Sequence, residues 1–272
     1  MSIITISGET GALRYELARE VCDRGGLDLI DRRTLMDAVA GLVDINRQEQ
    51  QILAEQGPAL LDMGDRRSQV FAAMLESVLL QYAQTDNVVL MGRGANYLVR
   101  LVPGVLRIRV VSPLELRAQR LARREGLELD RARQLATVID QQRRAYIAHI
   151  FNSDWASPLN YDLVLNMGRL SLEQAASVVL DLSAHPEFDH SSETIRIMAE
   201  LVLAARVRRR LVEEVDVHAL EVEAQGDSIL LRGYLGTTED LAKAIALAEG
   251  VEGVGRVSSA LEVSPMLMKF LP

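Results

Sequence analysis

The residues from Gly8 to Tyr15 have the types and spacing needed to bind an anion. They align with the pattern G-x-x-x-x-G-K-[ST], in which backbone N–H groups surround phosphate, a lysine supplies charge and a hydroxyl binds Mg²⁺. Gly8 fits the first glycine and Arg14 falls at the lysine position, whereas Leu13 replaces the second glycine and Tyr15 replaces the hydroxyl residue. This pattern predicts a phosphate site, with an ordinary glycine turn as the alternative, formed by Gly8, Glu9, Thr10, Gly11, Ala12, Leu13, Arg14 and Tyr15.

The departures from this pattern have chemical consequences. Leu13 brings a Cβ to a position where backbone would approach phosphate. Arg14 keeps the positive charge but lacks the compact geometry of a lysine. Thr10 could supply a hydroxyl only if the loop were rearranged. We therefore expect ATP binding to be weakened, altered or absent.

The elements around this loop indicate an α/β fold. A short β-branched run at 2–7 precedes the loop, and apolar residues at helical spacing follow it over 12–24, ending at Gly25-Gly26. The stretch 32–84 is rich in helix signals, with breaks at 57–58 and 64. Further strands are expected at 87–91, 104–111 and 161–166, with helices from 113, over 130–149 and from 171. Alternating strands and helices predict a doubly wound parallel sheet.

The pattern changes after a polar segment at 183–192, which is typical of a linker. A helix is expected at 193–214, then a hairpin of 220–224 and 228–234, a helix at 239–249 and a strand at 255–263. This order predicts a small, separate α+β unit. The expected division is 1–182 for the first domain, 183–192 for the linker, 193–264 for the second domain and 265–272 for a tail.

Composition excludes several classes of protein. The net charge of −8 argues against a nucleic-acid partner, and no run approaches the ~18–20 apolar residues that span a bilayer. Membrane contact is not expected, and the chain is expected to be cytoplasmic. The single cysteine, Cys22, lies in an amphipathic stretch and is expected to be buried. The sequence gives no Cys and His spacing typical of a metal site.

Four segments of the first part match, in order, those of a known family. They are ITISGETGALRYELA at 4–18, LIDRRTL at 29–35, VVLMGRGANYLV at 88–99 and the long stretch from Ile139 to Ala175, which contains DQQRRAYIAHIFNSDW and YDLVLN. Together they resemble the cytidylate-kinase-like family of P-loop kinases over about residues 1–182. The resemblance implies a P-loop kinase-type sheet with helical nucleotide-binding and lid regions.

The resemblance also implies roles for individual residues. The family transfers phosphate from ATP, with Mg²⁺, to CMP or dCMP, and such chemistry depends on positioning and on charge neutralisation. Catalytic roles are implied for Arg14, Arg143 and Arg144, the last two on the helix near a mobile lid. Positions in the acceptor site are implied for Asp31, Arg32, Arg93, Asn96 and Asp140, with Asp140 orienting the lid arginines, and Arg120 and Arg124 would flank the lid.

Simpler interpretations remain open for several of these residues. Arg120, Arg123 and Arg124 could belong to a solvated helix face, and Asp140 with Arg144 could be an i,i+4 pair that supports a helix. Asn96 stands where the family has an aspartate, which removes a carboxylate that could help to recognise the cytosine or sugar.

Residues from about 191 to 264 resemble the BON domain. The resemblance rests on the hairpin ALEVEAQGDSILLRGYLGT at 219–237 and on AIALAEGVEGVGRVSSALEV at 244–263. BON domains are modules for binding membranes, polymers or proteins, and here a protein partner or self-association is preferred. The sequence therefore supports an ATP-dependent nucleoside monophosphate kinase with an interaction module. The alternative is a catalytically impaired nucleotide-binding regulator or scaffold on the same fold.

Overall fold

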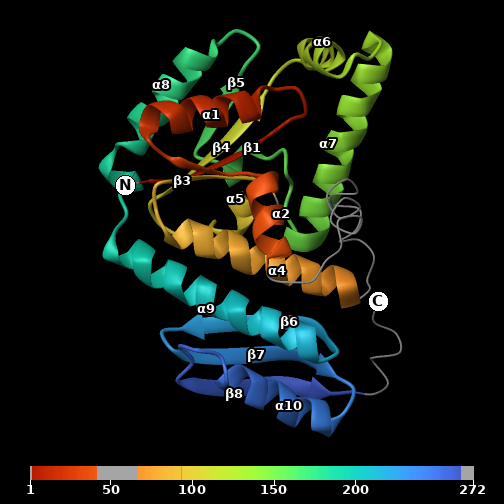
Figure 1. Ribbon diagram of the computed structural model, residues 1–272, viewed down its shortest axis with the longest axis vertical. Coiled ribbons are helices and arrows are strands. Elements are labelled where there is room, and N and C mark those ends of the chain that lie inside the picture. The colour runs from red at the N-terminus through yellow and green to blue at the C-terminus, as the bar shows by residue number, and fades with distance from the viewer. Residues whose placement is uncertain (1, 42–65, 93, 265–272) are drawn as a thin grey trace.

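The first part of the chain folds around a parallel sheet. The computed structural model describes residues 2–41, 66–92 and 94–264, apart from the side chains of 67 and 68. Its larger sheet has the strand order β2-β3-β1-β4-β5, with every neighbouring pair parallel. This confirms the predicted α/β class (Figure 1). The strands are β1 (Ile3–Gly8), β2 (Asp28–Ile30), β3 (Val88–Met91), β4 (Val105–Val111) and β5 (Leu163–Asn166).

Helices cover both faces of this sheet, because each face is apolar. On one face, α1 (Arg14–Gly25) and α8 (Leu172–Ser183) pack on the side chains of Ile4, Ile6 and Ile108. On the other face, α2 (Arg32–Ala40), α4 (Arg66–Gln84) and α5 (Ala95–Leu98) pack on Ile3 and Leu90. Beyond β4, α6 (Leu114–Glu125) and α7 (Leu129–Phe151) form a helical pair with its own small core.

The sequence prediction missed strand β2. This strand has only three residues and pairs with β3 through Asp28 opposite Val88, so it is too short to show a periodic pattern. Helix α1 begins at Arg14 rather than at 12, since the loop continues through Leu13. The predicted breaks at 57–58 and 64 lie outside the described residues.

The C-terminal unit contains a three-stranded sheet in the order β6-β7-β8. Strands β6 (Val217–Gln225) and β7 (Ser228–Leu235) form the predicted antiparallel hairpin, and Gly226 takes a φ of +60° in its turn. Helix α10 (Thr238–Glu249) then returns the chain so that β8 (Arg256–Val263) pairs parallel to β7. The order of helix, two strands, helix and strand is therefore as expected.

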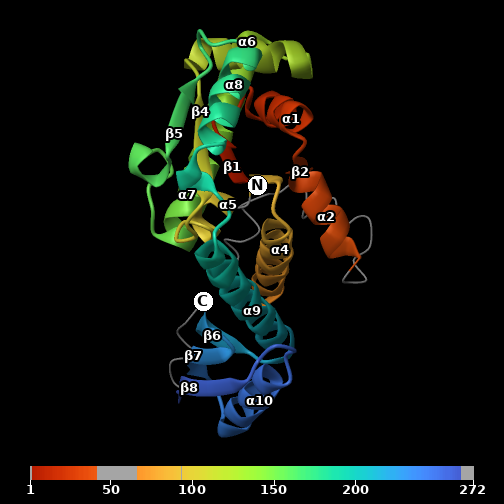
Figure 2. The same ribbon diagram turned by 90° about the vertical axis from the view of Figure 1, so that its left-hand side faces the viewer.

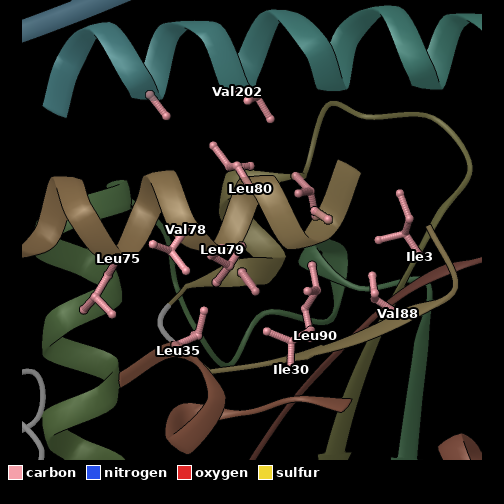
Figure 3. Packing of buried hydrophobic residues seen from close by; sticks show 14 of the residues in the cluster. Ile3, Ile30, Leu35, Leu75, Val78, Leu79, Leu80, Val88, Leu90 and Val202 are labelled. Carbon is pink, nitrogen blue, oxygen red and sulfur yellow. The ribbon is translucent and has the colours of Figure 1, made fainter. Parts of the chain in front are cut away.

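Helix α9 (Ser192–Glu214) contributes to two cores. Met198, Val202 and Ala205 pack with α4 in the core beneath the parallel sheet, and Figure 3 shows Val202 facing Leu80 of α4. Leu203 and Val207 pack in the core of the second sheet. Both views show α9 between α4 and the small sheet (Figures 1 and 2). The two parts of the chain are thus joined by a shared, apolar layer.

The segment expected to be a linker packs against the first part. It contains a 3-10 turn at Pro186–Phe188, and His190 Nδ1 lies 2.9 Å from Asp86 Oδ2. Gly104 has a φ of +78°, and a Cβ there would lie 2.5 Å from the carbonyl oxygen of Asp189, so only glycine allows this approach. The boundaries at 182 and 192 stay predictions, and the tail at 265–272 lies outside the described residues.

The shared layer gives a testable cost for truncating α9. Met198 is fully buried against α4, so Met198→Ala should lower the free energy of unfolding by about 2 to 5 kcal/mol. Ile195→Ala is the matched control, because Ile195 is exposed on the same helix and should change stability by less than about 1 kcal/mol. Urea denaturation followed by circular dichroism measures both, and equal effects would contradict this packing.

Candidate active site

The loop between β1 and α1 adopts the backbone conformation that glycine favours at two positions. Gly11 has a φ of +80°, and a Cβ there would lie 2.6 Å from the carbonyl oxygen of Arg117. Leu13 has a φ of +65° and a ψ of 25°, which is left-handed. This conformation costs a non-glycine residue about 1–2 kcal/mol. Leu13 thus keeps the backbone conformation that the second glycine of the motif would favour.

The first N–H groups of α1 have no side-chain cap. Helices α2, α8, α9 and α10 are each capped by a side-chain oxygen, from Asp31, Ser171, Ser191 and Thr237, whereas α5, α6 and α7, like α1, have no side-chain cap. In α1 the N-cap residue is Leu13, which cannot accept a hydrogen bond. Unsatisfied N–H groups at a helix N-terminus attract anions. The end of α1 therefore has the chemistry that binds a phosphate oxygen.

The carboxylate of Asp140 on α7 holds the loop from outside. Its Oδ1 accepts hydrogen bonds from the backbone N–H and the hydroxyl of Thr10, both at 2.9 Å. Its Oδ2 accepts from Arg117 Nη1 at 2.8 Å, and Arg143 Nη1 lies 3.3 Å from Oδ1. Arg143 also donates to the Thr10 hydroxyl at 2.9 Å and to the Gly8 carbonyl at 3.3 Å. One carboxylate thus fixes the loop and orients Arg143.

Two buried arginines on the inner side of the loop were not found from the sequence. Arg117 donates to the carbonyls of Ser112 and Thr10, and its Nε lies 3.3 Å from Glu9 Oε2. Arg109 lies 4.3 Å above the centre of the Trp155 ring and 3.8 Å from Glu9 Oε1. Each had one feature in the sequence that could have indicated a role. Arg109 is a charged residue inside an otherwise apolar strand, and Arg117 has the i,i+3 spacing that places it beside Arg120 on one helix.

Glu9 is therefore occupied by protein contacts. Its Oε2 accepts the backbone N–H of Ser112 at 3.2 Å in addition to facing Arg117. This places the Glu9 side chain in the wall of the loop, where it neutralises buried arginines.

Arg14 and Arg143 are neighbouring cations that lie close to a single carboxylate, that of Asp140. Burial lowers the pKa of Arg14, and the charges of Arg143 and then Arg124 oppose its protonation, whereas Asp140 favours it. Burial likewise lowers the pKa of Arg143, with Asp140 again acting in the other direction. Within the described ranges, Arg14 forms no ion pair and no side-chain hydrogen bond. A bound anion at this position would relieve both the repulsion and the desolvation.

The other predicted lid arginines lie in different environments. Arg120 is half-buried and donates to the carbonyls of Gly11 and Met167. Arg124 is exposed, pairs with Glu125 and lines a groove beside the loop. Arg144 is exposed and lines neither this groove nor the cleft described below. Adjacent side chains on a helix point about 100° apart, and it is Arg143 that points toward the loop. The alternative pairing of Asp140 with Arg144 is wrong, since Asp140 pairs with Arg143 and Arg117.

A cleft opens beside the loop at the carboxyl ends of β1 and β3, where ligands bind in open α/β sheets. It brings together Arg14, Tyr15 and Arg143 from the loop side with Asp31 and Arg32 at the start of α2. Its wall is completed by side chains and backbone of the two strands, α5, α7 and the following loop: Thr5, Ile6, Ser7, Leu90, Met91, Gly92, Gly94, Ala95, Asn96, Tyr97, Tyr146, Ile147 and Trp155. The predicted site residue Arg93 lies outside the described residues.

Two of the predicted acceptor-site residues form hydrogen bonds within the protein that stabilise its fold. Asp31 caps α2 by accepting the N–H of Thr34 at 3.0 Å. Asn96 is buried, accepts from the Thr5 hydroxyl at 3.2 Å and donates to the carbonyl of Asn160 at 3.1 Å. Asn96 therefore ties the segment after α7 to the sheet. The predicted places of both residues in the acceptor site stay predictions.

The donor groups of the cleft suit phosphate better than a protein-bound metal. Among the described residues, no group of three or more His, Cys, Asp or Glu side chains could hold a metal ion. The carboxylates nearest the loop, Glu9 and Asp140, already face arginines. The arginines and the uncapped end of α1 fit the phosphate groups of a ligand.

Comparisons with known proteins agree with this geometry. Residues 3–169 match the model of the cytidylate kinase-like family. The chain belongs to this family. It is 30% identical to a cytidylate kinase of Pyrobaculum aerophilum over 66% of this chain and 92% of that protein, and 26% identical to one of Pyrococcus horikoshii over 65% and 85%. An uncharacterized protein from Eubacterium ventriosum shares the fold, with a TM-score of 0.53, 16% identity and coverage of 67% of this chain and 98% of that chain.

The remainder of the chain has its own match. Residues 200–265 match the model of the BON domain. This range begins inside α9, the helix that also packs against α4. In the described parts of the chain, no helix has both the length and the apolar character needed to cross a bilayer.

The Asp140 contacts predict a large effect from a small change. Asp140→Asn keeps the shape but leaves the half-buried Arg143 without a carboxylate and the buried Arg117 with Glu9 alone, so the free energy of unfolding should fall by about 2–4 kcal/mol. Asp130→Asn is the control on the same helix, because Asp130 is exposed and its loss should cost less than about 1 kcal/mol. Chemical denaturation measures both variants; an Asp140→Asn protein as stable as the control would show that the loop does not depend on this carboxylate.

Proposed function

We propose that this member of the cytidylate kinase-like family transfers the terminal phosphate of ATP to CMP, dCMP or a related nucleoside monophosphate. The observation that carries the proposal is the pair of half-buried arginines, Arg14 and Arg143, that line the cleft beside the uncapped start of α1. Phosphoryl transfer requires little covalent chemistry from the protein and depends on positioning and charge neutralisation. Two arginines and a helix N-terminus supply both.

The donor phosphates would lie along the loop. Backbone N–H groups after Gly11 would contact them, with Arg14 and Arg143 neutralising their charge as it develops on the transferring group. Arg120 would act by positioning, since its hydrogen bonds to Gly11 and Met167 hold the loop against β5. Arg124 would lie beside the phosphates on the side of the groove. Arg144 lines neither the cleft nor the groove, so it would reach the transferring phosphate only after a change in the conformation of the lid.

The acceptor would occupy the cleft. Its phosphate would face the loop, with Arg32 and the predicted Arg93 as its charged partners. Its base would lie toward Asn96, Tyr97 and Tyr146, where polar and aromatic groups meet. The family match and the curated relatives named cytidylate kinase favour a pyrimidine nucleotide as this acceptor.

A second candidate is a nucleotide-binding regulator or scaffold with impaired turnover. Leu13 favours it, because a leucine side chain stands where the motif has bare backbone. Tyr15 favours it as well, because a phenol replaces the small hydroxyl that would bind Mg²⁺. Under this candidate the cleft binds nucleotide and transfers nothing.

We also propose that the BON domain provides an interaction surface, for a protein partner or for a second copy of the chain. A reaction that consumes ATP requires a compartment that supplies it, and we therefore place the protein in the cytoplasm. Nucleic acid and membrane are not among the proposed partners.

A phosphotransfer assay on matched arginine variants separates the two candidates. With ATP, Mg²⁺ and CMP or dCMP in a coupled assay, the wild type should produce ADP, and Arg143→Met should lose about 100-fold or more in kcat. Arg131→Met is the control, because Arg131 is exposed on the same helix and lines neither cleft. Nucleotide binding by calorimetry without turnover would overturn the kinase assignment and support the regulator; the absence of binding would leave only a scaffold.

Leu13→Gly tests the loop itself. Glycine accepts a φ of +65° without strain and removes the side chain from the path of a phosphate. Calorimetric titration with ATP·Mg²⁺ should therefore show a dissociation constant about tenfold lower than that of the wild type, which corresponds to about 1.4 kcal/mol. Leu13→Ala removes the side chain but keeps the strain, so it should give a smaller gain. Unchanged affinity in both variants would mean that phosphate does not approach at Leu13.

A further inference from the structure

Among the described residues, no strand pairs with the outer edge of β8, the last strand of the C-terminal sheet. The strand runs over eight residues without proline, pairs with β7 on one side and ends the sheet on the other. In both views β8 lies farther from the first domain than β6 and β7 do (Figures 1 and 2). An open edge of this length is a template for adding another strand.

The backbone contacts show which groups point outward from β8. Ser264 donates its N–H to the Leu235 carbonyl at 2.9 Å, and Arg256 donates toward the Asp227 carbonyl, so even-numbered N–H groups face β7. Because successive backbone groups of a strand point to opposite sides, residues 257, 259, 261 and 263 direct theirs outward. Within the part of the chain that the structure describes, the N–H of Leu261 donates only to the hydroxyl of Ser259, at 3.3 Å.

The sequence of β8 is complementary to itself. From Arg256 to Glu262 it reads Arg-Val-Ser-Ser-Ala-Leu-Glu. Antiparallel pairing of two copies centred on Ser259 places Arg256 opposite Glu262 and Val257 opposite Leu261 of the second copy. Arg256 and Glu262 are exposed, and within the described residues neither side chain forms an ion pair. Val257 and Leu261 already belong to the apolar core of the sheet, so their pairing would extend that core.

The hydrogen-bonding geometry agrees with this register. Pairs of residues that both direct their N–H and C=O groups outward can exchange two hydrogen bonds. With Ser259 at the centre, these pairs are Ser259 with Ser259 and Val257 with Leu261 of the second copy, which are the odd-numbered residues. The charged pairs then fall on positions where side chains approach closely, which strengthens them.

We propose that the chain forms a two-fold symmetric dimer in which two β8 strands pair antiparallel about Ser259, giving one six-stranded sheet. The proposal deepens the assignment of the BON domain as an interaction module and names its partner as a second copy of this chain. It does not depend on phosphotransfer. Because β8 lies far from the first domain, both clefts would stay open in the dimer.

Charge reversal tests the partner and the register together. The mass of the full-length chain, measured by sedimentation equilibrium over the micromolar range, should rise with concentration toward that of a dimer. Arg256→Glu and Glu262→Arg should each raise the dissociation constant about tenfold or more, because each places two like-charge pairs across the interface. The double variant restores opposite charges in the reversed order, so its dissociation constant should return to within about threefold of the wild type.

Three further samples make the outcome decisive. Glu221→Arg changes the charge equally on the exposed surface of β6, at the opposite edge, and should leave the dimer unchanged. Ser259→Pro removes one outward N–H and no bond to β7, and should weaken the dimer. The chain ended after Ser264 should still dimerise; dimerisation gained only on this truncation would assign the edge to residues 265–272. That result, a monomer at all concentrations, or failure of the double variant to recover overturns the proposal, while kinase activity is read separately.

Discussion

The carboxylate of Asp140 is the constraint on which the candidate site depends. It lies on α7, far along the chain from the loop, yet it binds the backbone and side chain of Thr10 and pairs with arginines from α6 and α7. Without it, Arg117 would face Glu9 alone, and Arg143 would have no carboxylate partner among the described residues while lying close to another cation, Arg14. With it, the loop has a fixed outer wall. The charge of Arg14 and part of that of Arg143 are then left for an anion on the cleft side.

This arrangement divides the charged residues near the loop into two groups. Glu9, Arg109 and Arg117 satisfy one another inside the protein, and Arg109 also stacks on Trp155. These groups support the loop and are shielded from a ligand. Arg14 and Arg143 line both the cleft and the neighbouring groove, so they are the cations that a bridging phosphate would meet.

The thiol of Cys22 is buried in the core between α1 and the parallel sheet. Burial raises its pKa to about 12, which makes it unreactive near neutral pH.

Much of the fold could be predicted because long, periodic segments have strong signals. The strands before Gly8 and after Asn87, the hairpin around Gly226 and the helix at 193–214 all follow from such patterns. Strand β2 could not, because three residues carry no period. The family resemblance places Arg143 beside the loop, where the structure has it, whereas Arg109 and Arg117 depend on tertiary contacts with Glu9 and Trp155 that their positions in the sequence do not specify. Helical periodicity alone also does not indicate that α9 packs against α4 on one side and against the C-terminal sheet on the other.

The central claim is that the cleft holds positive charge that a phosphate group would neutralise. Thermal unfolding in increasing inorganic pyrophosphate tests it directly, with sodium chloride at matched ionic strength as the reference and Arg14→Met as the control. Pyrophosphate should raise the melting temperature of the wild type progressively, as expected for a ligand that binds the folded state, and this shift should be lost in Arg14→Met. A shift no larger than that in chloride, or one that persists unchanged in Arg14→Met, would contradict it.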